Sequence, residues 1–255
     1  MASAAAPTTR GTAAAEAADG PFRSAPTSAR VTICASSPTS SRSWLSPFRS
    51  CGSRAARSAV SSAPSRSSDP FAAAIDVATV RVVAAVKAVG ASNPVVLIDG
   101  RSGAGKSSLA RRLVAAWPLR GRVQLVALDS LYPGWDGLAE GVESARELIL
   151  NQHARGFVGV WQRWDWDASA HAEAHAVDPS LPLIVEGSGI ITPVTARLSD
   201  VRVWLESPSE SRRRRALDRD GETYRPHWTR WASQEDDHVR RDDPVAHATV
   251  VVPIP

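Results

Sequence analysis

The hydrophobic positions of this chain form a regular pattern only after residue 68. Runs of apolar, mostly β-branched residues, of a length typical of strands buried on both faces, lie at Pro94–Asp99, Val123–Ser130, Leu181–Gly187, Val201–Ser207 and Ala248–Val252. Helical stretches separate these runs at about 69–90, 106–117, 138–153, 208–220 and 229–241. Asp69 can cap the first stretch, with Pro70 in its first turn and Gly90 at its end. Strands that alternate with helices predict an α/β fold, with a five-stranded parallel sheet flanked by helices.

The first 68 residues lack this pattern. They are rich in Ala, Ser, Pro, Thr and Arg, and their only acids are Glu16 and Asp19. Such a segment cannot bury enough apolar surface to offset its ordering entropy. We therefore predict a low-complexity disordered tail at 1–68 and one folded domain at 69–255. Three interpretations of the tail stay open: a start codon placed too far upstream, an organellar transit peptide, and a functional tail.

The positive charge of the chain belongs to this tail. The 30 basic and 26 acidic residues give a formal net charge of +4. Eight arginines and two acids give the tail +6, and the 22 basic and 24 acidic residues that remain give the domain −2. We expect no nucleic-acid partner for the domain. No apolar run approaches the ~20 residues of a membrane span, and the first residues lack the order of a secretory signal. We therefore expect a cytoplasmic protein without a membrane partner.

Cysteine and histidine positions bear on metal chemistry. Cys34 and Cys51 both lie in the tail, which excludes a structural disulfide or a thiolate metal site in the domain. His171 and His175 are four residues apart and could share a helix face. On an Ala-rich segment we interpret them as exposed surface residues rather than metal ligands.

The segment LIDGRSGAGKSSLA contains one of only two lysines in the chain. Its residues 100–107 match G-x-x-x-x-G-K-S between a predicted strand and a predicted helix, the context of a P-loop. Glycines let backbone N–H groups surround phosphate oxygens, and the helix N-terminus adds its dipole. We predict that the loop binds ATP through Gly100, Arg101, Ser102, Gly103, Ala104, Gly105, Lys106, Ser107 and Ser108.

Two side chains of the loop have distinct predicted roles. Lys106 would reach the β- and γ-phosphates, and the Ser107 hydroxyl would be a ligand of Mg²⁺. Arginine replaces lysine almost everywhere else in this chain. A lysine at this place indicates a site that admits a compact ammonium and excludes the broader guanidinium. The alternative is a glycine-rich turn with an exposed lysine.

Other sequence features narrow the class of NTPase. The guanine-specificity motif N-K-x-D is absent, which counts against a GTPase, and the later motifs of helicases and AAA+ machines are absent too. The roughly 150 residues that follow the loop suit a compact single-domain kinase.

From Val95 onward the sequence resembles the uridine kinase and nucleoside/nucleotide kinase-like group of P-loop proteins. Besides the P-loop, LDSLY at 128–132 is similar to the DSFY motif of that group, LIVEG at 183–187 to its EG strand end, and RALDRDG at 215–221 to its lid motif R-R-I-x-R-D. The resemblance implies an ATP- and Mg²⁺-dependent kinase with a lid at about 208–242. It implies that Asp129 is the base beside the acceptor hydroxyl, that Glu186 lies near the metal, and that Arg215 and Arg219 surround the transferring phosphate.

Reasoning from the residues alone agrees with these roles but leaves alternatives. Parallel sheets bind ligands at the carboxyl ends of their strands, where the P-loop, Asp129 and Glu186 all fall. One carboxylate could accept a hydroxyl proton, a second could hold the water shell of Mg²⁺, and arginines could neutralise developing charge. Alternatively, Asp129 is a helix or turn cap, Glu186 is a buried structural acid, and the arginine-rich segment is a solvated helix face.

Three tracts depart from the uridine kinase pattern and resemble an actinobacterial branch of ATP-binding proteins: YPGWDGL from Tyr132, WQRWDWDASA from Trp161 and WTRWASQEDDH from Trp228. The tryptophans of the first two tracts, Trp135, Trp161, Trp164 and Trp166, could contact the acceptor or pack in the core. We expect transfer of the ATP γ-phosphate to a hydroxyl of a small metabolite, for instance a nucleoside. A kinase for a sugar acid or an antibiotic, and an ATP-binding regulatory protein with little turnover, are the alternatives. The oligomeric state stays open.

Overall fold

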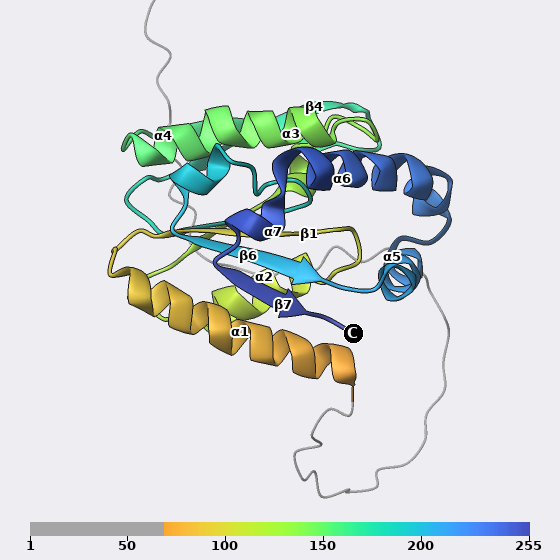
Figure 1. Ribbon diagram of the computed structural model, residues 1–255. Helices are drawn as coiled ribbons and strands as arrows, with labels where there is room; N and C mark the ends of the chain where they lie inside the picture. The colour runs from red at the N-terminus through yellow and green to blue at the C-terminus, as the bar shows by residue number, and fades with distance from the viewer. Residues whose placement is uncertain (1–68) are drawn as a thin grey trace, which may run out of the picture. The chain divides into compact units, whose positions relative to one another are not determined.

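Five short parallel strands form the central sheet of the computed structural model, which describes residues 69–255 (Figure 1). In spatial order they are β2 (Gln124–Ala127), β5 (Leu183–Glu186), β1 (Val95–Gly100), β6 (Val201–Glu206) and β7 (Val250–Pro253), and each pairs with its neighbours in parallel. The predicted α/β fold with a five-stranded parallel sheet is confirmed. The predicted tail at 1–68 lies outside the described residues.

Alternate residues of β1 supply two separate cores. Val96 and Ile98 pack with helices α1 (Pro70–Val89) and α2 (Lys106–Ala115), which cover one face of the sheet. Val95 and Leu97 pack on the opposite face, beneath α3 (Leu138–Ala145) and α6 (Trp228–Asp242). Figure 1 shows these layers above and below the strands. A strand buried on both faces explains why its sequence is continuously apolar.

The predicted helix ends agree with the structure at α1. The Asp69 side chain accepts a hydrogen bond from the Phe71 N–H at 3.0 Å, Pro70 is the first helical residue, and Gly90 ends the helix in the left-handed region at φ 75°. The helix predicted at 138–153 is also present. It consists of α3, a π-helical turn η2 (Arg146–Leu150) and α4 (Asn151–Ala154).

The sequence patterns missed an antiparallel hairpin of strands β3 (Gly159–Asp165) and β4 (Ala170–Val177). The suggestion that His171 and His175 share a helix face is wrong, because both lie on β4. They are exposed, as expected, with His175 stacked on Trp161 and His171 edge-on to Trp164. Most β4 residues are exposed, and the residues that alternate with its histidines and glutamate are alanines, which favour helices over strands.

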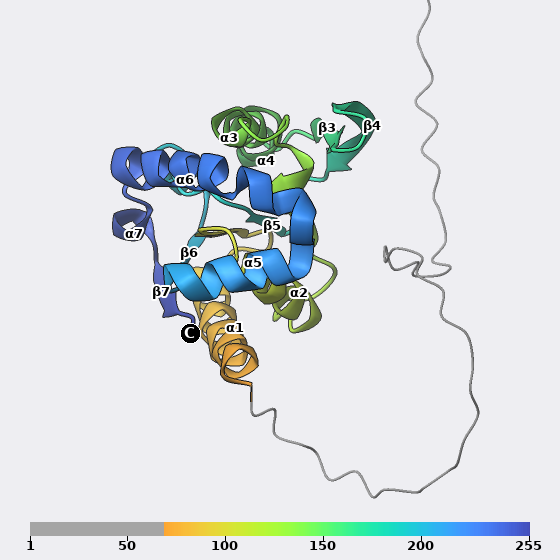
Figure 2. The same ribbon diagram turned by 90° about the vertical axis from the view of Figure 1, so that its right-hand side faces the viewer.

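The predicted lid consists of helices α5 (Ser209–Tyr224) and α6, joined by a 3₁₀ turn η4 (Arg225–His227). Figure 2 shows α5 running across one end of the domain before the chain turns back into α6. Gly221 breaks the helical geometry of α5 at φ 59°, ψ −136°, close to the predicted helix end. A short helix α7 (Pro244–His247) then leads into β7, and 3₁₀ turns η1 (Leu128–Ser130) and η3 (Thr195–Leu198) follow β2 and precede β6.

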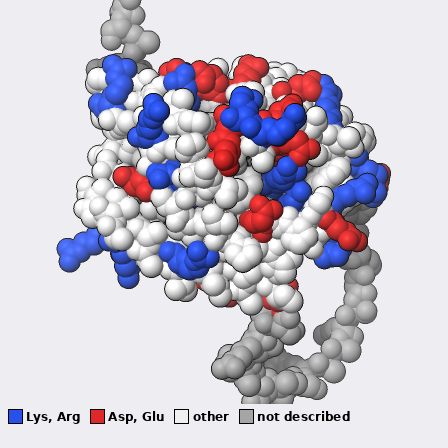
Figure 3. Space-filling model, in the orientation of Figure 1, with Lys and Arg blue, Asp and Glu red and all other residues white. Residues whose placement is uncertain are grey.

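The surface of the described residues has no strongly basic face in the view of Figure 3, where acidic and basic side chains are interspersed. Among these residues, no helix is both long enough and apolar enough to cross a membrane.

Candidate functional site

A cavity of about 710 Å³ lies where the P-loop, the chain after β2, the end of β5 and the α5–α6 arm meet. Its wall comprises most of the residues predicted for the site. They are Ser102, Gly103, Gly105, Lys106, Ser107 and Ser108 of the P-loop, together with Asp129, Glu186 and Arg219. Four segments far apart in the sequence therefore converge on one space, as expected at the carboxyl ends of parallel strands.

The P-loop has the backbone that its glycines permit. Gly105 precedes α2 at φ 103°, and Gly103 adopts φ 78°, a region that side chains disfavour. A Cβ atom on Gly103 would lie 2.1 Å from the Arg212 carbonyl oxygen of α5. The loop is thus packed tightly against the arm on its outer side, and α2 starts directly at Lys106.

Lys106 is held at the centre of the loop. Its Nζ donates hydrogen bonds to the Gly100 and Arg101 carbonyl oxygens at 2.8 and 3.2 Å and to the Ser188 hydroxyl at 3.0 Å. Three oxygens around one nitrogen match the compact, tetrahedral ammonium and would not accommodate a planar guanidinium. The packing agrees with the prediction that only lysine fits here.

Three of the residues predicted to bind ATP do not line the cavity. Ala104 is fully buried in the core with α1 and α2. The Arg101 side chain forms an ion pair with Asp236 of α6, and the Gly100 N–H donates to the Asp99 carboxylate at 2.6 Å. These residues belong to the framework of the loop rather than to its inner surface.

Two carboxylates of the cavity differ in environment. Asp129 is exposed on η1, just past the end of β2, whereas Glu186 is buried at the end of β5. Burial raises the pKa of Glu186, and the charge of Asp129 raises it further. The charges of Lys106 and Arg219 and a hydrogen bond with Ser107 act in the opposite direction. A cation bound beside Glu186 would favour its charged form, which burial and Asp129 disfavour.

This donor set fits Mg²⁺. Mg²⁺ prefers oxygen ligands and is commonly held by one or two carboxylates together with substrate phosphates. The Ser107 hydroxyl and the Glu186 carboxylate supply such oxygens beside the P-loop. Within residues 69–255 there is no group of three or more His, Cys, Asp or Glu side chains that could hold a metal ion by themselves.

The arginines of α5 point to two different places. Arg219 lines the cavity and is paired with Asp220 at 2.6 Å. Arg215 does not line it: its Nε donates to the Gly103 carbonyl at 2.8 Å, and its guanidinium lies over the Phe71 ring. Arg212 is buried and donates to the Ser102 carbonyl at 3.3 Å. One turn of the helix therefore holds the outside of the P-loop, and the next faces the cavity.

The four tryptophans named in the sequence analysis also fall into two groups, one that lines the cavity and one that does not. Trp135 and Trp166 line the cavity, and the Trp166 Nε1 donates to the Asp129 carbonyl at 2.8 Å. Trp135 is also a packing residue, stacked on His227 at 4.3 Å and on Tyr224 at 5.4 Å between ring centroids. Trp161 and Trp164 lie on β3, against the two histidines of the hairpin, and do not line the cavity.

Sequence reasoning missed the face of α6 that points inward. Trp231, Glu235, His238 and Asp242 are spaced by four, three and four residues, and all four are buried. This spacing places them on one helix face. Three polar residues at that spacing are a signal for a buried polar contact, but polar residues on a predicted helix are normally exposed to solvent. Ser188, which contacts Lys106, was missed because it lies just after the EG motif and belongs to no recognisable motif itself.

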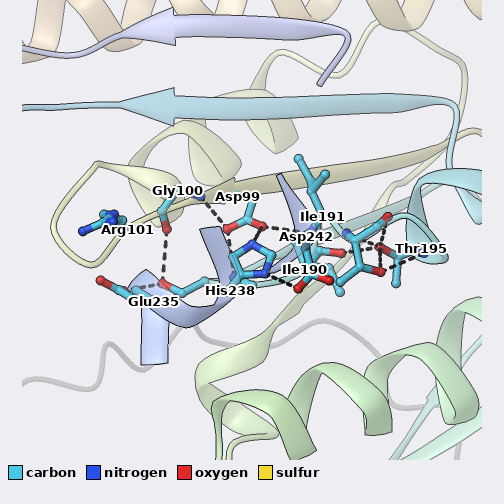
Figure 4. A network of polar contacts seen from close by, with 12 residues as sticks. Asp99, Gly100, Arg101, Ile190, Ile191, Thr195, Glu235, His238 and Asp242 are labelled. Carbon is cyan, nitrogen blue, oxygen red and sulfur yellow. Dashed lines mark hydrogen bonds and ion pairs between the residues drawn. The ribbon is translucent and has the colours of Figure 1, made fainter. Parts of the chain in front are cut away.

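The α6 face joins a buried network at the end of β1 (Figure 4). Asp99 accepts backbone N–H bonds from Gly100 at 2.6 Å, Gly189 at 2.9 Å and Ile191 at 2.8 Å. His238 Nδ1 lies 2.9 Å from an Asp242 oxygen, and its Nε2 lies 3.3 Å from an Asp99 oxygen in an ion-pair contact. The network ties α6 to the strand that leads into the P-loop.

His238 makes the stability of the domain depend on pH. Burial alone would lower its pKa, but Asp99, and then Asp242, outweigh this effect and raise it above its ordinary value. Arg241 is the other charged group of the network and pairs with Asp242 at 2.6 Å. Because the folded pKa is the higher one, the stabilisation is complete below about pH 6.5, the ordinary value for histidine, and is lost as pH rises through the folded pKa.

We therefore expect His238→Gln to lower the free energy of unfolding by about 1–3 kcal/mol near pH 6, because two buried carboxylates lose a charged partner. The difference should shrink at alkaline pH, once the pH has risen through the folded pKa and the wild-type imidazole has become neutral. Thermal unfolding of both proteins across this range measures it. A difference that stays constant or grows with pH would show that His238 is not held as a cation.

Comparisons with known proteins agree with this fold. No family model and no curated protein matches the sequence. Among solved structures, a protein of Bacillus stearothermophilus described as a possible uridine kinase matches with a TM-score of 0.52 and 20% identity, over 71% of this chain and 98% of its own. A protein of Silicibacter sp. TM1040 described as a fructose transport system kinase has a TM-score of 0.44 and 16% identity, over 69% and 98%. The first of these likenesses shows that the domain shares the α/β P-loop fold, as the motif resemblance implied.

Proposed function

We propose that this protein is an ATP- and Mg²⁺-dependent phosphotransferase that moves the γ-phosphate of ATP to a hydroxyl group of a small molecule. One observation supports the proposal above all. A single cavity holds the P-loop lysine, an exposed carboxylate, a buried carboxylate and an arginine from a helical arm. Binding of ATP requires only the first of these, whereas transfer to an acceptor uses all four.

The P-loop side of the cavity would hold the nucleotide. Backbone N–H groups of the loop and the N-terminus of α2 face the phosphates, and Lys106 exchanges its carbonyl contacts for phosphate oxygens. Ser107 and Glu186 would hold Mg²⁺, which, when bound, neutralises charge on the phosphates. Burial of Glu186 keeps this oxygen in a fixed place beside the loop.

Asp129 would act as the base on the acceptor side. Its carboxylate takes the proton of the acceptor hydroxyl while the acceptor oxygen bonds to the γ-phosphorus. The bond from that phosphorus to the β–γ bridging oxygen breaks, and ADP is the leaving group. The hydrogen bond from Trp166 to the Asp129 carbonyl supports the backbone at this residue.

The two arginines of the lid motif receive different roles. Arg219 lines the cavity and would exchange Asp220 for the transferring phosphoryl group, where its positive charge stabilises the transition state. Arg215 would act as a positioning residue that keeps the Gly103 carbonyl in place. The lid assignment is thus retained for Arg219 and revised for Arg215.

A nucleoside is our first candidate for the acceptor. Five aromatic rings line the cavity. Tyr132, Tyr224 and Trp231 are buried, whereas Trp135 and Trp166 are partly exposed and would offer apolar contact to a flat ring. The structural neighbour from Bacillus stearothermophilus is itself described as a possible uridine kinase. Another hydroxyl-bearing metabolite, such as a sugar acid or an antibiotic, is the second candidate. We propose a cytoplasmic enzyme without a nucleic-acid partner.

ADP release from ATP and Mg²⁺, measured over a panel of nucleosides, sugar acids and aminoglycosides, tests the proposal. We expect at least one acceptor to raise the rate well above that with ATP alone, since general-base assistance alone contributes about 10²–10⁴-fold. ATP binding without stimulation by any acceptor class would instead favour a regulatory protein. Absence of ATP binding would overturn both interpretations.

A further inference from the structure

Glu235 contacts the P-loop through residues that themselves line the cavity. It lies on α6, only 2% of it is exposed, and it is not part of the cavity wall. Its Oε1 accepts three hydrogen bonds: from the Ser102 N–H at 2.7 Å, the Ser188 hydroxyl at 2.9 Å and the Trp231 Nε1 at 3.1 Å. A buried carboxylate oxygen with three donors is a rigid anchor point, because charge-assisted bonds are shorter and stronger than neutral ones.

Two of these donors lead directly to the nucleotide-binding groups. Ser102 is a P-loop residue, and the direction of its N–H fixes the peptide plane between Arg101 and Ser102. Ser188 donates its proton to Glu235 and accepts a hydrogen bond from Lys106 at 3.0 Å. A chain of hydrogen bonds thus runs from Glu235 through Ser188 to the Lys106 ammonium.

The position of Glu235 is itself fixed by residues that follow it on α6. One and two turns further, His238 and Asp242 bind the Asp99 network (Figure 4). The next residue, Asp236, forms an ion pair with Arg101 of the P-loop. The helix therefore presents Glu235 to the loop in a single register.

We propose that Glu235 is a positioning residue for nucleotide binding. It orients the Ser102 peptide and the Ser188 hydroxyl, so that the loop has the shape that receives a triphosphate before the ligand binds. This inference rests on the proposed binding of ATP by the P-loop. It adds a contribution from α6, whose sequence has no counterpart among the motifs that identified the site. Pre-organisation of this kind lowers the cost of binding, since the loop is ordered before the ligand arrives.

Substitution separates the hydrogen-bond acceptor from the charge. Glu235→Ala leaves the Ser102 N–H and the Ser188 hydroxyl buried without this partner. We expect this variant to bind ATP about 10–100-fold more weakly than wild type. Glu235→Gln keeps an oxygen at the same reach, so we expect it to restore affinity to within about threefold of wild type. Asp237→Ala, an exposed position on the same helix, is the matched control and should bind like wild type.

The experiment is calorimetric titration with ATP and Mg²⁺ in the absence of acceptor, well below the lowest melting temperature of the set. A merely structural role would lower the melting temperature of Glu235→Ala and leave its affinity unchanged, which would overturn the proposal. If Glu235→Ala does not fold, Ser188→Ala breaks the same chain by removing one hydroxyl. We expect that variant to lose about 3–10-fold in affinity, and wild-type affinity there would also overturn the proposal. If wild type binds no ATP, the proposed function itself fails, and the two failures are therefore distinct.

Discussion

Lys106→Ala is expected to abolish productive ATP binding and to reduce kcat/KM by at least about 10²–10³-fold, the scale for loss of one preorganised charge at a transferring phosphate. Lys106 is the only lysine side chain at the loop, and its nitrogen is surrounded by the Gly100 and Arg101 carbonyls and the Ser188 hydroxyl. The same variant should show no binding in a direct titration with ATP and Mg²⁺.

Lys106→Arg is expected to perform nearly as badly, although it keeps the charge. A guanidinium is planar and broader than an ammonium, so it cannot occupy the space between three oxygens that lie 2.8–3.2 Å from Nζ. The other lysine of the chain, Lys87 in the last turn of α1, provides the control: Lys87→Arg should be neutral. Full activity of Lys106→Arg would refute the steric explanation for this lysine.

The parts of the fold that sequence could predict are those with a local signal. The inner strands β1, β5 and β6 are short apolar runs because they are buried on both faces. The P-loop is recognisable because glycines and a lysine must occur in a fixed order. Asp129 and Glu186 were predicted from their resemblance to the motifs of the uridine kinase group, and the convergence of strand ends in a parallel sheet agreed with that prediction. Their convergence on one cavity is what the structure adds.

The parts that could not be predicted depend on contacts between distant segments. Arg215 and Arg219 are one turn apart on α5, yet only the packing of α5 on Gly103 determines that the first faces the loop and the second the cavity. Glu235 is more than 130 residues from the Ser102 N–H that it binds. The hairpin escaped detection because strand β4 is mostly exposed and rich in alanine.

The two carboxylates of the cavity are expected to have separable roles, although each affects the other. Asp129→Asn keeps the shape of the side chain and removes the proton acceptor. ATP and Mg²⁺ should still bind, while transfer falls by about 10²–10⁴-fold. Loss of the Asp129 charge also removes one cause of the raised pKa of Glu186, so Glu186 should ionise at lower pH in this variant.

Glu186→Gln should instead weaken the binding of Mg²⁺. The variant loses a charged oxygen beside the Ser107 hydroxyl, and hard cations bind neutral amide oxygens less well than carboxylates, so more Mg²⁺ should be needed for half-maximal activity. Activity at saturating Mg²⁺ should recover to a greater extent than in Asp129→Asn. Asp218→Asn, an exposed carboxylate on α5, serves as the control that changes net charge equally without touching the cavity.

A Mg²⁺ titration of wild type and these variants decides between the roles, because the two explanations predict opposite responses to excess metal. A missing base leaves a defect that no concentration of Mg²⁺ repairs, whereas a weakened metal site is repaired by mass action. If Asp129→Asn is rescued by excess Mg²⁺ and Glu186→Gln is not, the roles are exchanged: the exposed carboxylate after β2 then holds the metal. In that case the buried carboxylate, whose pKa burial and Asp129 raise, would be the group that takes the acceptor proton.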